Sequence, residues 1–198
     1  MEKSIKHEIK ADYLLEKGME LLWEKGYNAT SVNDIVVAAG VPKGSFYFYF
    51  DSKEDFVVKA LDKYFIEFVS PAFDLLDDKS IAPRERILAF YEYRMNMLKE
   101  QMHCKRGCMA CNLGNEMAEH SEEIRKKIAD REHSVYHKLI DAIQEAQNSG
   151  EISDSLNATD LATFMEDAGK GAMITMKERN SSYPIDNVMN MIRKVLLV

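Results

Sequence analysis

The chain has 198 residues, of which 46% are hydrophobic and 30% are charged, a composition typical of a folded globular protein and not of a disordered one. Lys and Arg number 26 and Asp and Glu number 33, so the formal net charge is −7, which argues against a protein that binds nucleic acid or anionic membranes through bulk positive charge. The sequence contains no apolar run of the roughly 18 residues that a membrane-spanning helix requires, so we expect no membrane partner.

The first ten residues carry three lysines and two glutamates and lack the apolar stretch of a signal peptide. We therefore expect a cytoplasmic protein whose three cysteines are not a secreted disulfide framework.

Apolar residues recur at helical spacing along the whole chain, and no stretch alternates as a strand does, so we predict an all-α fold. The expected N-terminal elements are a long helix over 5–25, short helices over 32–39 and 43–50, and a helix from 53 towards 78 that Pro71 disturbs. Further helices are expected over 83–102, 108–119, 122–148, 159–179 and 184–197, with Pro, Gly, Ser or Asn in each break.

The two short helices near the N-terminus predict a helix-turn-helix, in which the second helix enters the major groove of DNA. Thr30 and Ser31 are candidate N-caps of the first helix, and Asp34 stands three residues after Ser31, as at many helix starts. Gly40 supplies the backbone freedom that the bend requires.

The sequence AGVPKGSFYFYF over residues 39–50, followed by SKE at 52–54, resembles the N-terminal DNA-binding domain of the TetR family of bacterial repressors. The resemblance covers residues 5–60. It implies a helix-turn-helix DNA-binding domain over 1–55, a larger antiparallel helical domain over 56–198 for ligand binding and dimerisation, and a homodimer on a palindromic double-stranded DNA operator. Pro42 departs from the serine that is frequent in the family at this position.

The resemblance also implies which residues contact DNA. Phosphate or sugar contacts fall to Thr30, Lys43, Tyr47, Tyr49 and Lys53, base-edge contacts to Lys43, Gly44, Ser45 and Phe46, and Ser31 completes the set. Packing in the core is the stronger alternative for Phe46 and Phe50, because aromatic residues at helical spacing are usually core. The alternative for Lys53 is a solvated surface lysine.

Residues 1–60 contain eight lysines, no arginine and ten acidic residues, so even this domain is not basic. Its positive charge must be segregated, and we expect one phosphate-facing surface formed by Lys3, Lys6, Lys10, Lys43 and Lys53. The bidentate contact of arginine with guanine is not available to this domain, so lysine, serine, main chain and DNA shape must supply specificity.

The second half of the chain contains no catalytic motif, and we predict neither an enzyme nor a cofactor. Ten of the twelve methionines follow residue 90, which favours either an adaptable apolar pocket for a small-molecule effector or simple core packing. Aromatic side chains that can add walls to such a pocket are Phe90, Tyr91, Tyr93 and Phe164.

The segment over 103–116 is unusual because it contains all three cysteines. A helix that starts at Cys108 would place its sulfur beside unpaired backbone N–H groups and next to Lys105 and Arg106, which favours the reactive thiolate. Its sequence also resembles the TetR subgroup that includes the N-ethylmaleimide-responsive repressor, which implies an electrophile- or oxidant-sensing site at Cys108, Cys111, Arg106 and Met109.

Three interpretations of this segment stay open: buried structural thiols, a redox sensor, or a metal sensor that uses His103, Cys104, Cys108 and Cys111. His133 and His137 lie one helical turn apart and are expected to be solvated.

The last two predicted helices have apolar faces and a run of small residues, Ala168, Gly169, Gly171 and Ala172, which favours dimerisation. We therefore predict a TetR-type dimeric transcriptional regulator released from DNA by an apolar ligand or by modification of a cysteine. The rival hypotheses are a metal- or redox-sensing regulator, a cysteine-dependent enzyme and a helical interaction module.

Overall fold

The computed structural model describes residues 2–198, with side chains from Lys10 onward, and contains no strand within that range. Residues 2–198 form ten α-helices and three π-helical turns. The helices are α1 (Glu2–Lys25), α2 (Val32–Ala38), α3 (Lys43–Tyr49), α4 (Lys53–Tyr64), α5 (Pro71–Asp77), α6 (Pro83–Asn96), α7 (Met109–Met117), α8 (Glu122–Asn148), α9 (Ala158–Arg179) and α10 (Tyr183–Met191). No helix in the described part is both long and apolar enough to cross a membrane.

The all-α prediction is confirmed, and every expected helix is present. The structure differs in three π-helical turns, η1 (Phe65–Val69), η2 (Met97–Gln101) and η3 (Ile192–Leu196). They interrupt or end the helices that were expected over 53–78, 83–102 and 184–197. A π turn keeps the helical spacing of apolar residues with only a small offset, so periodicity does not detect it.

The chain forms two compact units. The first contains the residues up to Ile66 together with Met109–Ala129, and the second contains Glu67–Cys108 and Asp130–Val198. Helix α8 therefore contributes to both.

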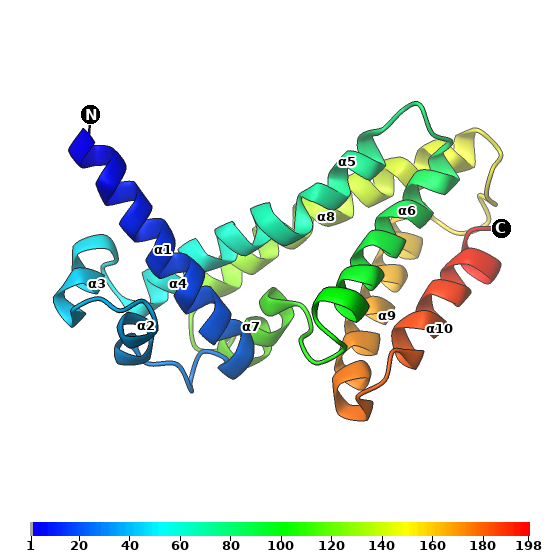
Figure 1. Cartoon of the computed structure of the whole chain (residues 1–198). Helices are drawn as coiled ribbons and strands as arrows, with labels where there is room; N and C mark the ends of the chain where they lie inside the picture. The colour runs from blue at the N-terminus through cyan, green and yellow to red at the C-terminus, as the bar shows by residue number, and fades with distance from the viewer. Residues whose placement is uncertain (1) are drawn as a thin grey trace. The chain divides into compact units, whose positions relative to one another are not determined.

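The first unit is built around the helix-turn-helix (Figure 1). Leu14 and Leu22 on α1, Ile35 on α2, Phe46 on α3 and Phe56 on α4 form its core, and each is at most 1% exposed. Burying side chains of this size supplies most of the stability of a unit this small.

Helix α7 belongs to the same unit and contacts α1 and α4. Its apolar face, Met109, Leu113 and Met117, recurs every four residues and is buried. The next turn ends at Ser121, whose hydroxyl accepts the Ile124 N–H at 3.1 Å and so caps α8.

In the second unit α6 packs against α5 and α10, and α9 packs against α10 (Figure 1). Arg84 at the start of α6 donates from Nε to the Leu197 carbonyl at 2.8 Å, which fastens the C-terminal end of the chain. Arg86 is buried, donates to the Leu76 carbonyl at 2.7 Å and pairs with Glu145 on α8. Buried arginine needs such partners because an unpaired charge is costly to desolvate.

Candidate functional site

Helix α2, the first helix of the helix-turn-helix, is capped by hydrogen bonds at both of its ends. Ser31 Oγ accepts the Asp34 N–H at 3.1 Å and the Asp34 carboxylate accepts the Ser31 N–H at 2.8 Å, so the predicted N-cap is confirmed as a capping box. The Ser31 hydroxyl also donates to the Asp34 carboxylate, and this bond together with the one from the Ser31 N–H lowers the pKa of Asp34. At the other end Gly40 has a φ of +64°, and Val41 N–H donates to the Val36 carbonyl at 3.0 Å, a Schellman arrangement that needs a left-handed residue.

Helix α3 has one buried and one exposed face. Phe46 and Phe50 are 0% and 2% exposed and meet Phe56 with ring centroids 5.5 and 4.9 Å apart. The core-packing interpretation of these two phenylalanines is therefore confirmed. The side chain of Phe46 is buried, and its implied contact with base edges stays a prediction.

The exposed face of α3 carries Lys43, Gly44 and Tyr47, and Ser45 and Tyr49 are half-buried. Tyr47 is 56% exposed. Together with the buried Phe46, six residues of the predicted DNA-contacting set therefore lie on one short helix. Lys3 and Lys6, which were expected to extend a phosphate-facing surface, lie outside the residues whose side chains are described.

Thr30 and Lys53 also come from the predicted phosphate-contacting set, but the structure gives their polar groups intramolecular partners. Thr30 is buried, and its hydroxyl donates to the Gly26 carbonyl at 2.7 Å. Lys53 is half-buried, its ammonium group donates to the Tyr27 carbonyl at 2.8 Å, and it lies 3.8 Å from the centroid of the Tyr27 ring. The Thr30 hydroxyl is enclosed in this structure, and the predicted phosphate or sugar contact of Thr30 stays a prediction. The Lys53 ammonium group has three N–H donors and uses one on Tyr27, so its predicted phosphate contact stays a prediction.

Sequence reasoning missed Phe48 on α3, which is 68% exposed. The signal was available: with residues 46 and 50 buried, helical spacing turns residue 48 to the same side as residues 44 and 47. An exposed phenyl group on a groove-entering helix is suited to contact with a thymine methyl group.

The cysteine segment lies between η2 and α7. His103 and Cys104 have φ values of 50° and 58°, a left-handed conformation that costs free energy in residues with a side chain. Cys108 immediately precedes α7, whose first helical residue is Met109. None of the three cysteines forms a disulfide, and each is half-buried. Within the described residues, no group of three or more His, Cys, Asp or Glu side chains is arranged to hold a metal ion.

Two members of the predicted effector set differ in exposure: Arg106 is half-buried, whereas Met109 is fully buried at 0% exposure. Cys111 lies on α7, one turn after Cys108. Met109 therefore serves packing in the first unit.

A buried charged cluster was not predicted. Glu166 on α9 is 5% exposed and accepts hydrogen bonds from both Arg94 Nη atoms, at 2.6 and 3.1 Å, and from the Tyr91 hydroxyl at 2.8 Å. Burial disfavours both charges, but Arg94 and Tyr91 hold the pKa of Glu166 below its usual value. Burial opposes the charge of Arg94, yet Glu166 raises its pKa, with smaller contributions from Tyr91 and Cys108. The structure therefore places an arginine in the electrostatic neighbourhood of Cys108.

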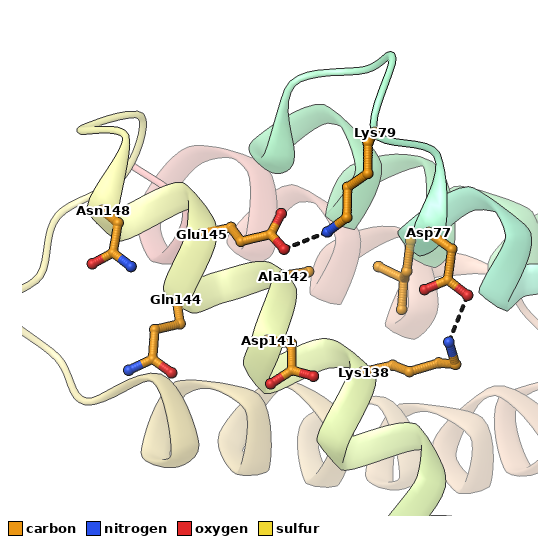
Figure 2. A pocket seen from close by; sticks show the side chains of 9 residues that line it. Asp77, Lys79, Lys138, Asp141, Ala142, Gln144, Glu145 and Asn148 are labelled. Atoms are coloured by element: carbon orange, nitrogen blue, oxygen red, sulfur yellow. Dashed lines mark hydrogen bonds and ion pairs between the residues drawn. The ribbon is translucent and has the colours of Figure 1, made fainter.

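The methionines of the second half mostly pack in the cores. Those that are buried are Met95, Met102, Met109, Met117, Met165, Met173, Met176 and Met189. A hollow of about 380 Å³ in the second unit lies instead between Leu76–Lys79 and α8. Figure 2 shows two ion pairs in it, Asp77 with Lys138 and Lys79 with Glu145, and the carboxylate of Asp141 also lines it. This hollow is polar and differs from the apolar pocket that the methionines suggested.

Helix α9 and the π-helical turn η3 leave large apolar side chains exposed. Phe164 is 60% exposed and Val195 is 51% exposed. Phe164 lines an apolar hollow of about 390 Å³ together with Leu156, Asp160, Leu161 and Leu196. Exposed apolar area of this kind marks a surface for a partner.

Comparison with known proteins agrees with this geometry. Residues 14–60 match the family described as bacterial regulatory proteins, tetR family, and residues 83–192 match the tetracyclin repressor-like C-terminal domain. The chain is 30% identical over 185 residues to the HTH-type transcriptional repressor DhaR of Mycobacterium sp. strain GP1, which covers 93% of this chain and 91% of DhaR.

The chain is also 26% identical over 196 residues to the transcriptional repressor NemR of Escherichia coli K12, with coverage of 99% and 98%. The crystal structure of reduced E. coli NemR has a TM-score of 0.82 at 25% identity, over 94% of this chain and 96% of that one. A regulatory protein TetR from Rhodobacter sphaeroides has a TM-score of 0.83 at 29% identity, over 91% and 95%. From the two matched domains and these relatives, the chain belongs to the TetR family of bacterial regulatory proteins.

Proposed function

We propose that this DNA-binding transcriptional regulator reads its operator with the exposed face of α3, formed by Lys43, Gly44, Ser45, Tyr47 and Phe48. The observation that carries the proposal is the division of α3 into a buried phenylalanine face and an exposed face with a lysine, a tyrosine and a glycine. Lys43 and the tyrosine hydroxyls suit phosphates, and Gly44 allows close approach of the backbone. In this proposal residues 1–55 contact DNA, and residues 56–198 carry the ligand and dimer contacts.

We further propose a homodimer formed through α9 and the C-terminal helix. The exposed Phe164 and Val195 and the apolar hollow beside Phe164 support it, because a two-fold axis would let each copy cover the apolar face of the other. Gly171 is exposed and has open space where a Cβ would stand, which leaves room for a close helix contact. Two reading heads in such a dimer would contact the half-sites of a palindrome.

The proposed effector acts at the cysteine segment, either as an apolar ligand or by modifying Cys108. The position of Cys108 directly before the first residue of α7 and the strained residues His103 and Cys104 support the second form, because a helix N-terminus favours the thiolate. Release from DNA would then be a population shift, in which the modified protein prefers a conformation that binds the operator less well.

The experiment that tests the reading face is operator binding by fluorescence anisotropy, with duplexes from the DNA that flanks the gene. We expect Lys43→Ala to weaken operator binding about tenfold and to reduce the slope of log K against log salt by about one, as loss of one phosphate contact does. Lys126→Ala on α8 is the matched control and should bind as the wild type does. Equal affinity of Lys43→Ala and wild type would contradict the proposal.

The effector proposal is tested by treating the full-length protein with N-ethylmaleimide and measuring both site-resolved labelling and operator affinity. Cys108 should label fastest, and the loss of operator affinity should disappear in Cys108→Ser but persist in Cys104→Ser. Labelling of all three cysteines at the rate of an ordinary thiol would contradict the thiol-based form of the proposal.

A further inference from the structure

The turn that joins α1 to α2, Gly26–Asn28, is held by side chains from several directions. Gly26 has a φ of +81°, and its carbonyl accepts the Thr30 hydroxyl. The next carbonyl, that of Tyr27, accepts the Lys53 ammonium group from α4 at 2.8 Å. Because α2 starts a few residues later, the conformation of this turn sets how the helix-turn-helix is attached to α1.

The third side chain that hydrogen bonds this turn is that of Glu116 on α7. The Glu116 carboxylate accepts the Asn28 backbone N–H at 3.0 Å and the Asn28 Nδ2–H at 3.3 Å, across 88 residues of sequence. A Cβ built on Gly26 would stand 2.8 Å from Glu116 Cδ and closer still to one carboxylate oxygen. Glycine at residue 26 therefore provides both the left-handed turn and the space in which the carboxylate lies.

Glu116 lies on α7, which packs tightly against its neighbours in the first unit. Leu113 and Met117, its neighbours on α7, are buried, and Gly114 lets the Ile128 side chain of α8 approach to 3.5 Å from a Cβ position. The chain enters this helix directly from Cys108. A displacement of α7 would therefore carry the Glu116 carboxylate with it, and the turn to which it is bonded.

We propose that Glu116 couples α7 to the helix-turn-helix formed by α2 and α3, because its carboxylate accepts hydrogen bonds from the Gly26–Asn28 turn. The inference deepens the proposed function and rests on it for the DNA part only, since the bond between α7 and the turn exists whether or not the protein binds an operator. Glu116 is thus a positioning residue that touches neither DNA nor effector. Its carboxylate must extend to Asn28, so a substitution that shortens the side chain should break the hydrogen bonds.

The experiment compares Glu116→Gln, which keeps the length of the side chain and an acceptor oxygen, with Glu116→Asp, which keeps the charge but is about 1.5 Å shorter. Glu119→Asp is the matched control, because Glu119 lies just after α7 and is exposed. In the full-length protein, we expect the Asn28 amide to exchange with deuterium at least tenfold faster in Glu116→Asp, with little change in Glu116→Gln and in the control. Operator affinity should fall at least fivefold in Glu116→Asp alone.

A second measurement separates coupling from a merely structural role. Coupling is reciprocal, so saturating operator should change the rate at which N-ethylmaleimide labels Cys111 on α7. We expect a change of at least threefold in wild type and Glu116→Gln, and none in Glu116→Asp.

Three outcomes would overturn the proposal: unchanged Asn28 exchange in Glu116→Asp, an equal defect in Glu116→Gln, or a Cys111 labelling rate that operator does not affect in the wild type. If the wild type binds no operator, the proposed function fails, and the Asn28 exchange alone decides whether Glu116 holds the turn.

Discussion

Glu166→Gln is the substitution for which the structure allows the most detailed reasoning about stability. The carboxylate of Glu166 is 5% exposed and accepts three hydrogen bonds, two from Arg94 and one from Tyr91. Glutamine keeps the volume and one acceptor oxygen, but it removes the negative charge and turns an N–H donor towards a donor of Arg94. The Arg94 guanidinium group is then left in the interior without its counter-charge.

The magnitude follows from the exposure of the two partners. Removing one partner of a fully buried ion pair costs about 3–5 kcal/mol. The Arg94 side chain is 23% exposed and lies 4.9 Å from the Phe90 ring centroid, so water and the ring recover part of that cost. We therefore expect a loss of about 2–3 kcal/mol, which lowers the melting temperature by about 5–10 °C for a chain of this size.

The dependence on pH has a definite sign. Arg94 and Tyr91 hold the pKa of Glu166 below its ordinary value although burial opposes them, so the charged form stabilises the fold. That contribution is fully present above the pKa of an unfolded glutamate, about 4.3, and is lost as the pH falls through the lower pKa of the folded protein. The difference in free energy of unfolding between wild type and Glu166→Gln should stay constant from about pH 7 to 5.5 and become smaller at lower pH.

The assay is urea and thermal unfolding followed by circular dichroism at one fixed protein concentration, because dimerisation makes stability depend on concentration. The control is the double variant with Arg94→Met, which leaves no unpaired charge and should be more stable than Glu166→Gln alone. A melting temperature of Glu166→Gln within about 1 °C of wild type at pH 7, or a gap that widens as the pH falls, would refute the reasoning.

Three further substitutions have expected outcomes. Gly18→Ala should destabilise the protein to urea, because the added methyl group would lie 2.9 Å from Phe56 Cε1 and 3.0 Å from Ile35 Cγ2. Such overpacking costs about 1–3 kcal/mol, which outweighs the gain of about 1 kcal/mol in helix propensity. A variant that is more stable than the wild type would contradict this prediction. Phe164→Glu should raise the dimer dissociation constant at least tenfold in sedimentation experiments, with an unchanged helical spectrum, and an intact dimer would exclude α9 from the interface. Phe48→Ala should weaken operator binding about fivefold, the loss of roughly half the burial of a phenyl group, and unchanged affinity would place Phe48 outside the DNA contact.

Much of the fold was predictable because the signals for it are local. Ser31 and Asp34 form the capping box that their spacing predicted, and Gly40 adopts the left-handed conformation that the bend requires. The helix bounds followed because caps, glycines and prolines act within one turn of the residue that carries them. The aromatic spacing on α3 was equally informative, since it separated Phe46 and Phe50 from the exposed positions.

The candidate site was only partly predictable, because several of its contacts join residues far apart in the chain. Thr30 and Lys53 carry side chains suited to phosphate, but the fold brings the carbonyls of Gly26 and Tyr27 to them. No periodicity indicates that Glu166 meets Arg94, 72 residues away.

The amino-acid sequence by itself therefore determined the helices and the helix-turn-helix, because hydrophobic period, capping and turn chemistry operate over a few residues. Only the tertiary structure decided which of the polar side chains remain available to DNA and which are used inside the protein. The same holds for Glu116, because only the fold brings its carboxylate to Asn28, 88 positions earlier in the sequence. The physical reason is that a hydrogen bond or ion pair depends on distances of a few ångströms in space, which spacing along the sequence does not specify.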